Sequence, residues 1–195
     1  MQSLLQPLPS LLHQLQALRE AFWKEQHTSH ITGTDVAAIL GLGKFKDNRN
    51  PLDVYLKKKY PSQKEGETLN ILFSMGHAVE AVLAEWYESV TGSKVVLNSD
   101  FYEDEERPWI GGTPDAFAYN EDGSVTGLEF KSANFMNRSE FIEGVLGMGG
   151  SICFTYEMQV RLYMYLTGLD EYRLIVYVHD GVCSEANVKV ITVMR

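Results

Sequence analysis

The sequence of 195 residues has little cysteine, and its cysteines are not spaced to suit a metal centre. The two cysteines, Cys153 and Cys183, form no Cys-x-x-Cys pair, which argues against a thiolate-only zinc site and an iron–sulfur cluster. We interpret both as reduced, buried thiols of a cytosolic protein, with a disulfide between them as the open alternative. Any metal ion would therefore need ligands other than sulfur.

The chain also lacks an excess of positive charge, a membrane-spanning run and a secretion signal. Lys and Arg number 17 against 26 Asp and Glu, so the formal net charge is −9. This balance argues against non-specific coating of DNA, although a local basic strip would suffice for contact with DNA. No apolar run approaches the about 18 residues of a membrane span, and the first residues, broken by Pro7 and Pro9, lack the basic start of a signal peptide. We expect a cytoplasmic protein with no membrane partner.

Length and composition predict one domain with a sizeable core. The chain is 45% hydrophobic and 22% charged, which is ordinary for a globular domain. We divide it into an N-terminal helical part (1–66), a core that carries the candidate catalytic residues (67–180) and a terminal strand (181–195).

Apolar residues at helical spacing, together with capping residues, predict five helices. Leu11, Leu15, Leu18 and Phe22 follow the candidate cap Ser10 and form one stripe, which either packs on the core or binds a partner. The other helices are expected from about Thr34 to the stop at Gly41, over 51–60 after Asn50, over 67–92 with Gly92 at its end, and from about Thr155 to Thr167.

Two features of these helices need an explanation beyond helix formation. The helix over 51–60 carries the densest basic run of the chain, Lys57, Lys58 and Lys59. A run of this kind is commonly a solvated helix end, and a contact with phosphate is the alternative. The 67–92 helix contains Gly76, which weakens a helix by about 1 kcal/mol relative to Ala. Close packing or the approach of a ligand would account for it.

After residue 92 the hydrophobic period changes from that of a helix to that of a strand. A turn is expected at Asn120–Gly123, and Pro114 restricts its strand to an edge, a bend or an end. The three strands around these residues would form an antiparallel meander. The order of elements predicts an α/β or α+β fold with a central mixed sheet flanked by helices. The five strands are expected over 94–103, 109–120, 125–133, 172–180 and 187–194.

Asp115, Glu129 and Lys131 are the residues that point most directly to chemistry. Residues two apart on a strand share a face, so Glu129 and Lys131 project together while Phe130 turns into the core. Asp115 lies on the preceding strand, where the bend at Pro114 can turn its carboxylate to the same face. Two carboxylates and the Phe130 carbonyl would make a hard oxygen site for Mg²⁺ or Mn²⁺.

A lysine beside such a site has two uses. Lys131 can orient or help deprotonate an attacking water, and it can offset charge on a phosphate oxygen. Metal and lysine together suit phosphodiester hydrolysis. A cross-strand surface pair of Glu129 and Lys131 is the alternative.

Glu80, Gln159 and Tyr163 are polar positions on predicted helices that could join this group. Glu80 lies one turn after Gly76 with apolar neighbours, and a solvated helix acid is its alternative. Gln159 and Tyr163 are four residues apart, hence on one helix face, and could hydrogen-bond a water or a phosphate at the site. Their alternative is a pair of half-buried polar positions.

Five segments follow one another along the chain: HITGTDVAAILG, MGHAVEAVLAEWYESVTG, GGTPDAF, LEFKSA and YEMQVRLYMYLTG. Each segment alone is a weak signal, but five in order at compatible distances are a strong one, and they cover roughly residues 28–180. Taken together, they resemble the YqaJ / lambda-exonuclease family of viral recombination exonucleases, within the PD-(D/E)XK nuclease superfamily.

The resemblance implies a restriction-endonuclease-like PD-(D/E)XK core and two Mg²⁺ ions per site, with Mn²⁺ as a substitute. It further implies 5′-to-3′ degradation of linear double-stranded DNA in phage-type homologous recombination. The resemblance also implies a toroidal trimer that acts beside a single-strand annealing protein. It would place this chain with a phage or prophage in a bacterial host. A structure- or single-strand-specific nuclease of the same fold, or a catalytically idle DNA- or protein-binding module, are the alternatives.

The resemblance also implies roles for individual residues. Asp115 and Glu129 match the metal carboxylates, Lys131 the catalytic lysine, Glu80 the helix glutamate of a second metal, and Gln159 the glutamine of the last motif. A second set would bind DNA, including its 5′-phosphate: Thr34, Arg138, Tyr163 and, where the family's usual arginine is absent, His27 or His30. Phe73 matches a wedge between terminal bases, with a core aromatic as its alternative.

Overall fold

The structure is a computed structural model that describes most of the chain, namely residues 18, 21–22, 24–43, 48–61, 68–134, 154–179, 184 and 187–195. At 68–74, 133–134, 154 and 179 only the backbone is described. Several expectations therefore fall outside the described residues: those for Ser10, Leu11, Leu15, Arg138, Cys153 and Cys183, and for the side chain of Phe73.

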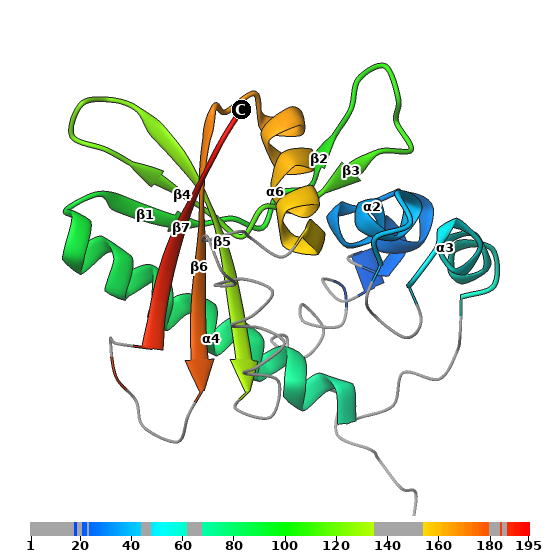
Figure 1. Cartoon of the computed structure of the whole chain (residues 1–195), viewed down its shortest axis with the longest axis horizontal. Coiled ribbons are helices and arrows are strands. Elements are labelled where there is room, and N and C mark those ends of the chain that lie inside the picture. The colour runs from blue at the N-terminus through cyan, green and yellow to red at the C-terminus, as the bar shows by residue number, and fades with distance from the viewer. Residues whose placement is uncertain are drawn as a thin grey trace, which may run out of the picture.

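A five-stranded mixed sheet forms the centre of the molecule, in the order β1-β4-β5-β6-β7 (Figure 1). The pair β5–β6 is parallel and the other neighbours are antiparallel, which confirms the mixed sheet expected from the sequence. The antiparallel arrangement of the first three strands is confirmed as well. The strands span Lys94–Leu97 (β1), Ala116–Tyr119 (β4), Val125–Asn134 (β5), Glu171–His179 (β6) and Val188–Met194 (β7).

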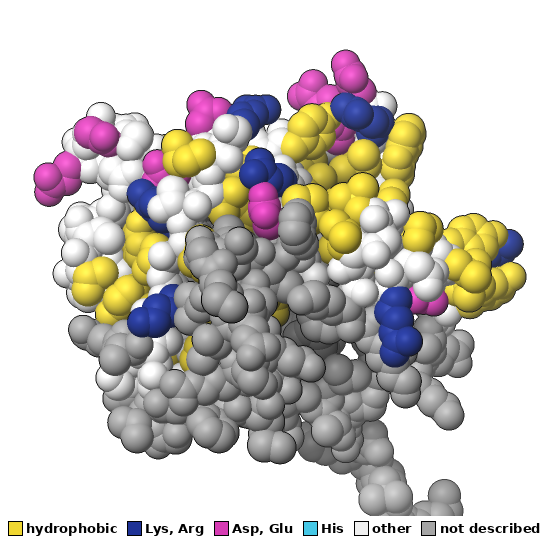
Figure 2. Space-filling view, viewed as in Figure 1, with side chains coloured by type: hydrophobic (Ala, Val, Ile, Leu, Met, Phe, Trp, Pro, Cys, Tyr) yellow, Lys and Arg dark blue, Asp and Glu magenta, His cyan; other side chains and the backbone are white. Residues whose placement is uncertain are grey.

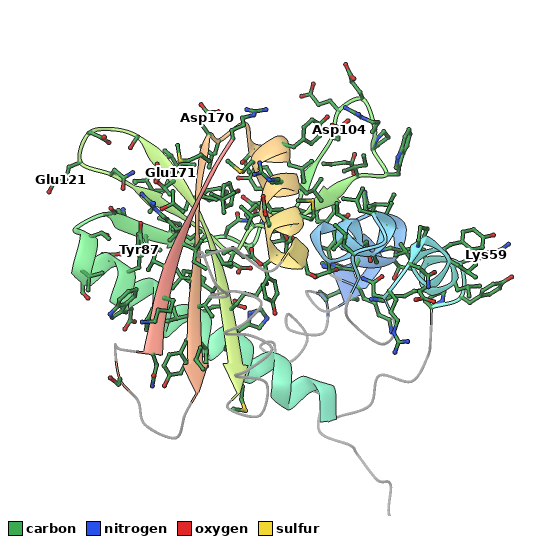
Figure 3. The ribbon with its side chains drawn as sticks, in the orientation of Figure 1. Lys59, Tyr87, Asp104, Glu121, Asp170 and Glu171 are labelled. Carbon is green, nitrogen blue, oxygen red and sulfur yellow. The ribbon has the colours of Figure 1, made fainter. Side chains whose placement is uncertain are left out.

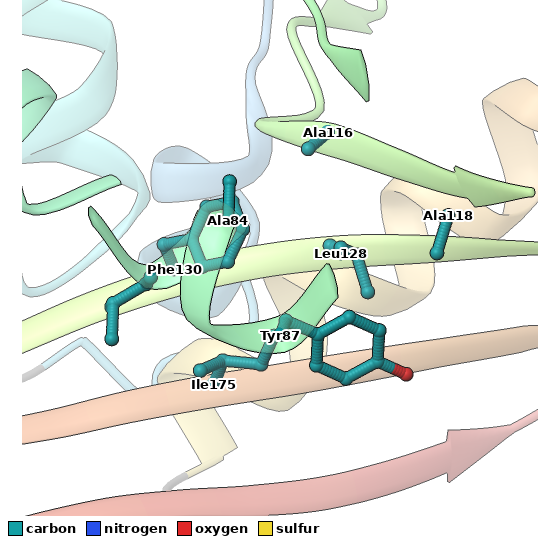
Figure 4. Packing of buried hydrophobic residues seen from close by; sticks show 8 residues of the cluster. Ala84, Tyr87, Ala116, Ala118, Leu128, Phe130 and Ile175 are labelled. Carbon is teal, nitrogen blue, oxygen red and sulfur yellow. The ribbon is translucent and has the colours of Figure 1, made fainter. Parts of the chain in front are cut away.

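Helices α4 (Thr68–Thr91) and α6 (Phe154–Thr167) cover opposite faces of this sheet. Alternate residues of a strand point to opposite faces, and on β6 Tyr172 packs with α6 while Ile175 packs with α4. The α4 side holds the larger cluster, in which Phe130 of β5 is buried as expected. Figure 4 shows Ala84 and Tyr87 of α4 lying over the strand residues Ala116, Ala118, Leu128, Phe130 and Ile175.

Two shorter helices and a small hairpin flank α6. Helix α2 (Gly33–Ile39) packs on α6, and α3 (Pro51–Lys59) packs on α2. Strands β2 (Tyr102–Glu103) and β3 (Gly111–Gly112) pair with each other outside the main sheet. A bridge between Ile31 and Ile110 joins the segment before α2 to this hairpin. The N-terminal elements are therefore anchored to the edge of α6.

The helix ends follow the expected signals closely. Asn50 caps α3 by accepting from the N–H groups of Leu52 and Asp53, and Pro51 is its first residue. Helices α4 and α6 end just before Gly92 and Gly168, whose φ angles of 74° and 72° lie in the left-handed region that favours glycine. Local sequence chemistry thus determines where these helices stop.

The single strands expected over 94–103 and 109–120 are wrong, because each divides between the two sheets. Asn98 ends the first strand, since its side-chain amide donates to the carbonyls of Asp100 and Pro114. Pro114 has no N–H to continue a ladder, so the second segment divides between Gly112 and Ala116. The expected bend at Pro114 is confirmed.

The N-terminal apolar stripe does not pack on the core where it is described. Leu18 and Phe22 are 67% and 54% exposed. Among the described residues, no helix is both long and apolar enough to cross a membrane.

Candidate active site

Strand β5 places Glu129 and Lys131 on the face that α6 covers. Their shared neighbour Phe130 points to the α4 side, so the strand alternation predicted from sequence is confirmed. Lys131 Nζ forms an ion pair with Glu129 Oε1. Glu129 has no exposed surface, which makes the alternative of a surface Glu–Lys pair wrong.

Asp115 joins this pair from the bend before β4. Ala116 pairs with Leu128, so the preceding residue, Asp115, lies beside Glu129 across the strands. Asp115 Oδ2 accepts a hydrogen bond of 2.7 Å from the N–H of Phe130. The bend at Pro114 therefore turns the Asp115 carboxylate onto β5, as the sequence predicted.

The two acidic groups lie in an environment that disfavours two negative charges. Burial and then the charge of Glu129 raise the pKa of Asp115 well above its ordinary value. Burial raises the pKa of Glu129 as well, although Lys131 opposes the shift. Glu129 Oε2 is buried and has no hydrogen-bond partner among the described residues. A buried carboxylate oxygen without a partner is costly unless a cation or donor meets it.

Glu80 reaches the same group from α4 at longer range. Its charge contributes to the raised pKa values of Asp115 and Glu129. Its carboxylate is 3.0 Å from His77 Nδ1, one turn earlier on the helix. Within the described part of the chain, no three Asp, Glu, His or Cys side chains stand close enough to hold a metal ion by themselves.

Lys131 keeps its proton in this setting. Burial alone would lower the pKa of Lys131, but the charges of Glu129 and Asp115 outweigh it and raise the pKa. The ammonium also lies 5.5 Å from the ring centre of Tyr156 on α6. Lys131 therefore brings positive charge to the two carboxyl groups.

Gln159 and Tyr163 of α6 complete the group, and both are buried. Gln159 Nε2 donates to Glu129 Oε1 at 2.6 Å and to the Tyr163 hydroxyl at 3.1 Å. Burial and the charge of Glu129 raise the pKa of Tyr163 well above its ordinary value, so the phenol stays neutral. Gln159 therefore contacts the Glu129 carboxylate directly, and Tyr163 contacts it through Gln159. Because both side chains are buried, the alternative of half-buried polar positions is wrong.

Close packing of glycines around α6 brings Gln159 and Tyr163 to this position. A Cβ added to Gly112 would lie 2.6 Å from Tyr163 Cε1, and one added to Gly33 would lie 2.6 Å from Gln159 Cγ. Only a residue without a side chain allows α2 and β3 to approach α6 so closely.

Three of the residues expected to bind DNA lie on α2 or in the segment just before it. Thr34 is exposed on the first turn of α2, with its hydroxyl 3.2 Å from that of Thr32. His27 is half-buried, and its carbonyl accepts a hydrogen bond of 2.5 Å from Lys58 Nζ. His30 is buried against Glu103, with a side-chain contact of 2.9 Å. Their roles stay predictions.

The ion pair between Asp35 and Lys58 was not predicted from the sequence. The Lys58 Nζ to Asp35 Oδ2 distance is 2.6 Å, and Asp35 is almost completely buried. Burial lowers the pKa of Lys58, while Asp35 opposes that shift. The Thr32-x-x-Asp35 spacing of a capping box was the available signal for Asp35. The pair fixes α3 to α2, and so corrects the reading of Lys58 as part of a freely solvated helix end.

Comparison with known proteins identifies the family of this chain. The sequence profile described as the YqaJ-like viral recombinase domain matches residues 22–170. The chain belongs to this family. The YqaJ-like region contains Glu80, Asp115, Glu129, Lys131 and Gln159. No curated relative matches the sequence.

Solved structures share the fold of this YqaJ-like domain. Two are of the alkaline exonuclease LHK-Exo from Laribacter hongkongensis, one of them in complex with dAMP. Both are 17% identical to this chain and align over 90% of it and 82% of their own length, with TM-scores of 0.63 and 0.65. A phage related exonuclease from Haemophilus somnus 129PT is 12% identical over 85% of this chain and 84% of its own, with a TM-score of 0.59. This likeness confirms the PD-(D/E)XK-type fold expected from the sequence.

Proposed function

We propose that this YqaJ-like domain is a metal-dependent exonuclease that degrades linear double-stranded DNA from the 5′ end. The observation that carries the proposal is the position of Asp115 beside the fully buried Glu129 and its ion pair with Lys131. Among the described residues, Glu129 Oε2 has no hydrogen-bond partner. Burial raises the pKa of both carboxyl groups, so a second negative charge here is disfavoured unless a cation stabilises it. Family membership and the fold shared with exonucleases agree with this reading.

The described residues fit a divalent cation of the Mg²⁺ type. Mg²⁺ is commonly bound through one or two carboxylates, with water and substrate phosphate completing its shell. Asp115 and Glu129 supply these carboxylates, and the main-chain oxygen of Phe130 is a further candidate ligand. Glu80 is the candidate for a second ion, with Mn²⁺ as the alternative metal. When bound, the metal supplies Lewis acidity and a hydroxide-like nucleophile near neutral pH.

The protein's own residues have three tasks in this proposal. Asp115 is held in place by the Phe130 N–H, and Glu129 by Gln159 and Lys131. Lys131 brings a positive charge to the place where charge develops on the phosphate. Tyr163 fixes the amide of Gln159, so the supporting shell is ordered before DNA binds.

We further propose the setting that the family membership suggests. The enzyme would act in the cytoplasm of a bacterial host, in phage-type recombination, beside a single-strand annealing protein. A homotrimer is the assembly that the resemblance favours. Thr34, His27 and Arg138 would meet the DNA end and its 5′-phosphate.

A cleavage assay tests the activity directly. Wild type and Lys131→Ala would be compared with Mg²⁺ and with EDTA, on a 5′-phosphorylated linear duplex and on covalently closed circular plasmid. We expect loss of the linear DNA only, with wild type and metal only. Labelling one 5′ end or one 3′ end shows from which end nucleotides are released.

Each other outcome has a distinct meaning. Cleavage of both DNAs would indicate an endonuclease of the same fold. Cleavage of single strands alone would indicate a single-strand-specific nuclease. Absence of hydrolysis together with tight DNA binding would indicate a binding module, and activity of Lys131→Ala equal to that of wild type would contradict the assigned chemistry.

A further inference from the structure

A cavity of about 320 Å³ lies between α3, the segment before α2 and Trp109. It shares no lining residue with the carboxylate group of the active site. Ile39, Val54 and Tyr55 are among its lining residues, and none of the described residues that line it carries a carboxylate. Its volume falls at the lower end of the about 300–1,000 Å³ typical of ligand pockets.

Two exposed aromatic side chains line this cavity, and a lysine contacts one of them. Tyr55 is 53% exposed and Trp109 is 54% exposed, and both line it. Lys59 Nζ hydrogen-bonds the Tyr55 hydroxyl at 2.7 Å and lies 5.2 Å from the centre of the Tyr55 ring and 5.5 Å from that of Tyr60. Figure 3 shows Lys59 at the outer end of α3. An ammonium group is thus held among exposed aromatic rings.

Helix α3 carries its apolar residues toward solvent. Val54 is its one buried residue among those described, whereas Leu52 and Leu56 are exposed. Figure 2 shows hydrophobic side chains gathered at this end of the molecule, with Lys or Arg side chains beside them. A contiguous apolar surface of this kind marks an interaction site.

The charge of α3 is opposite to that of the whole chain. Lys57, Lys58 and Lys59 form its last turn, in a chain of net charge −9. Asp35 already neutralises Lys58, and Asp53 is engaged at the start of the helix. Lys57 and Lys59 therefore remain to face a negatively charged ligand.

We propose that this cavity binds a nucleobase of single-stranded DNA. Tyr55 and Trp109 are the stacking surfaces, and Lys57 and Lys59 contact the adjoining phosphates. Exposed aromatic rings beside lysines suit flat bases on an anionic backbone, whereas an acidic peptide would not need the rings. The choice of DNA rests on the proposed function, since a 5′-to-3′ exonuclease leaves one strand unpaired. The site would hold that strand away from the carboxylates.

Fluorescence anisotropy with two labelled probes tests the site, in EDTA so that the DNA stays intact. One probe is a 12-nucleotide oligo(dT), and the other is an abasic oligomer of the same length and charge. We expect Tyr55→Ala and Trp109→Ala each to weaken oligo(dT) binding about fivefold or more, as loss of a stacking ring does. Tyr119→Ala is the matched control, because Tyr119 is exposed on β4.

Two further measurements complete the design. Lys59→Gln, with Lys94→Gln on β1 as its control, is expected to weaken both probes and to reduce the salt dependence of binding. Thermal unfolding of each variant shows that the fold is kept. Cleavage of linear duplex is measured in parallel. If the protein binds oligo(dT) at this site but does not cleave DNA, the result contradicts the proposed function and not this inference.

Three outcomes would overturn the inference. In the first, wild type does not bind oligo(dT), and in the second it binds the abasic oligomer as tightly as oligo(dT). In the third, the Tyr55 and Trp109 variants bind oligo(dT) as tightly as wild type. Sedimentation identifies another occupant: if Tyr55→Ala turns an oligomer into monomers without changing DNA binding, the surface joins copies of the chain. Competition by oligoglutamate of equal charge, together with equal abasic binding, would indicate an acidic protein partner instead.

Discussion

The side-chain amide of Gln159 donates a hydrogen bond to Glu129 Oε1 over 2.6 Å, which fastens α6 to β5 at a carboxylate with no exposed surface. Lys131 binds the same oxygen, while Oε2 has no partner among the described residues. One oxygen of the carboxylate is thus held by the protein, and in our proposal the other oxygen binds the metal ion. Glu129 is the residue at which fold and proposed chemistry meet.

Glu129→Gln separates the effect of Glu129 on the stability of the fold from its effect on cleavage. The pKa of Glu129 is raised in the folded state, so above its ordinary pKa the ionised form disfavours folding. The neutral amide removes that penalty and keeps an oxygen at the Oε1 position. We expect thermal unfolding in EDTA at neutral pH to occur at the same or a higher temperature. Cleavage should fall by more than the about 10–100-fold typical of losing a group that supports a metal ligand.

Glu85→Gln is the matched control for this variant, because Glu85 is exposed on α4. Glu85→Gln should change neither the unfolding temperature nor the rate of cleavage. A Glu129→Gln protein that cleaves DNA like wild type would remove Glu129 from the assigned chemistry.

Lys131→Met should abolish charge stabilisation without removing a metal ligand. We expect kcat to fall about 10²–10³-fold, as it does when one preorganised donor is lost from an active site. Binding of Mn²⁺, followed by calorimetry, should be retained, because both carboxylates remain. Lys94→Met, at an exposed position of β1, is the control. Loss of Mn²⁺ binding in Lys131→Met would show that the lysine organises the metal site instead.

Gly112→Ala and Gly76→Ala should change stability in opposite directions. A Cβ at Gly112 would meet Tyr163 Cε1 at 2.6 Å, so we expect a loss of about 1–3 kcal/mol, typical of overpacking. A Cβ at Gly76 meets no described atom within 4 Å, so the substitution should stabilise α4 by up to about 1 kcal/mol. Urea unfolding of both proteins measures the two values. Equal stability of the pair would contradict the close approach of β3 to α6.

Asp104 should make the fold sensitive to acid. Its carboxylate accepts hydrogen bonds from the Tyr165 hydroxyl and from the Arg107 N–H, which lower the pKa of Asp104 below its ordinary value of 3.8. A lowered folded-state pKa stabilises the fold above the ordinary pKa, and this stabilisation is lost as the pH falls through the lower folded value. The thermal unfolding temperature should therefore fall less steeply between neutral pH and pH 3 for Asp104→Asn than for wild type.

Tyr165→Phe checks the cause of this acid sensitivity. It removes the largest contribution to the lowered pKa of Asp104 and keeps the carboxylate. We expect the unfolding temperature of Tyr165→Phe to fall with pH at a rate between those of wild type and Asp104→Asn. Identical pH profiles for all three proteins would show that the hairpin between β2 and β3 does not depend on the Asp104–Tyr165 contact.

The features that the sequence predicted are local. Asn50 and Pro51 begin α3, and Gly92 and Gly168 end their helices, because capping depends on a few neighbouring residues. The alternation of Glu129, Phe130 and Lys131 follows from the period of a strand, and it correctly separated a buried ring from a polar pair. The order of the motifs further identified the family.

Only the tertiary structure decided what these local elements meet. Glu129 and Gln159 are 30 positions apart, and Asp35 and Lys58 are 23 apart, so neither contact follows from any spacing in the sequence. The end of the first strand at Asn98 likewise depended on a side chain that hydrogen-bonds across to Pro114. The sequence determined which residues could carry charge and where helices begin and end. The packing of α6 on β5 determined that Glu129 would lose all contact with water, because burial is a property of the assembled layers and not of one strand.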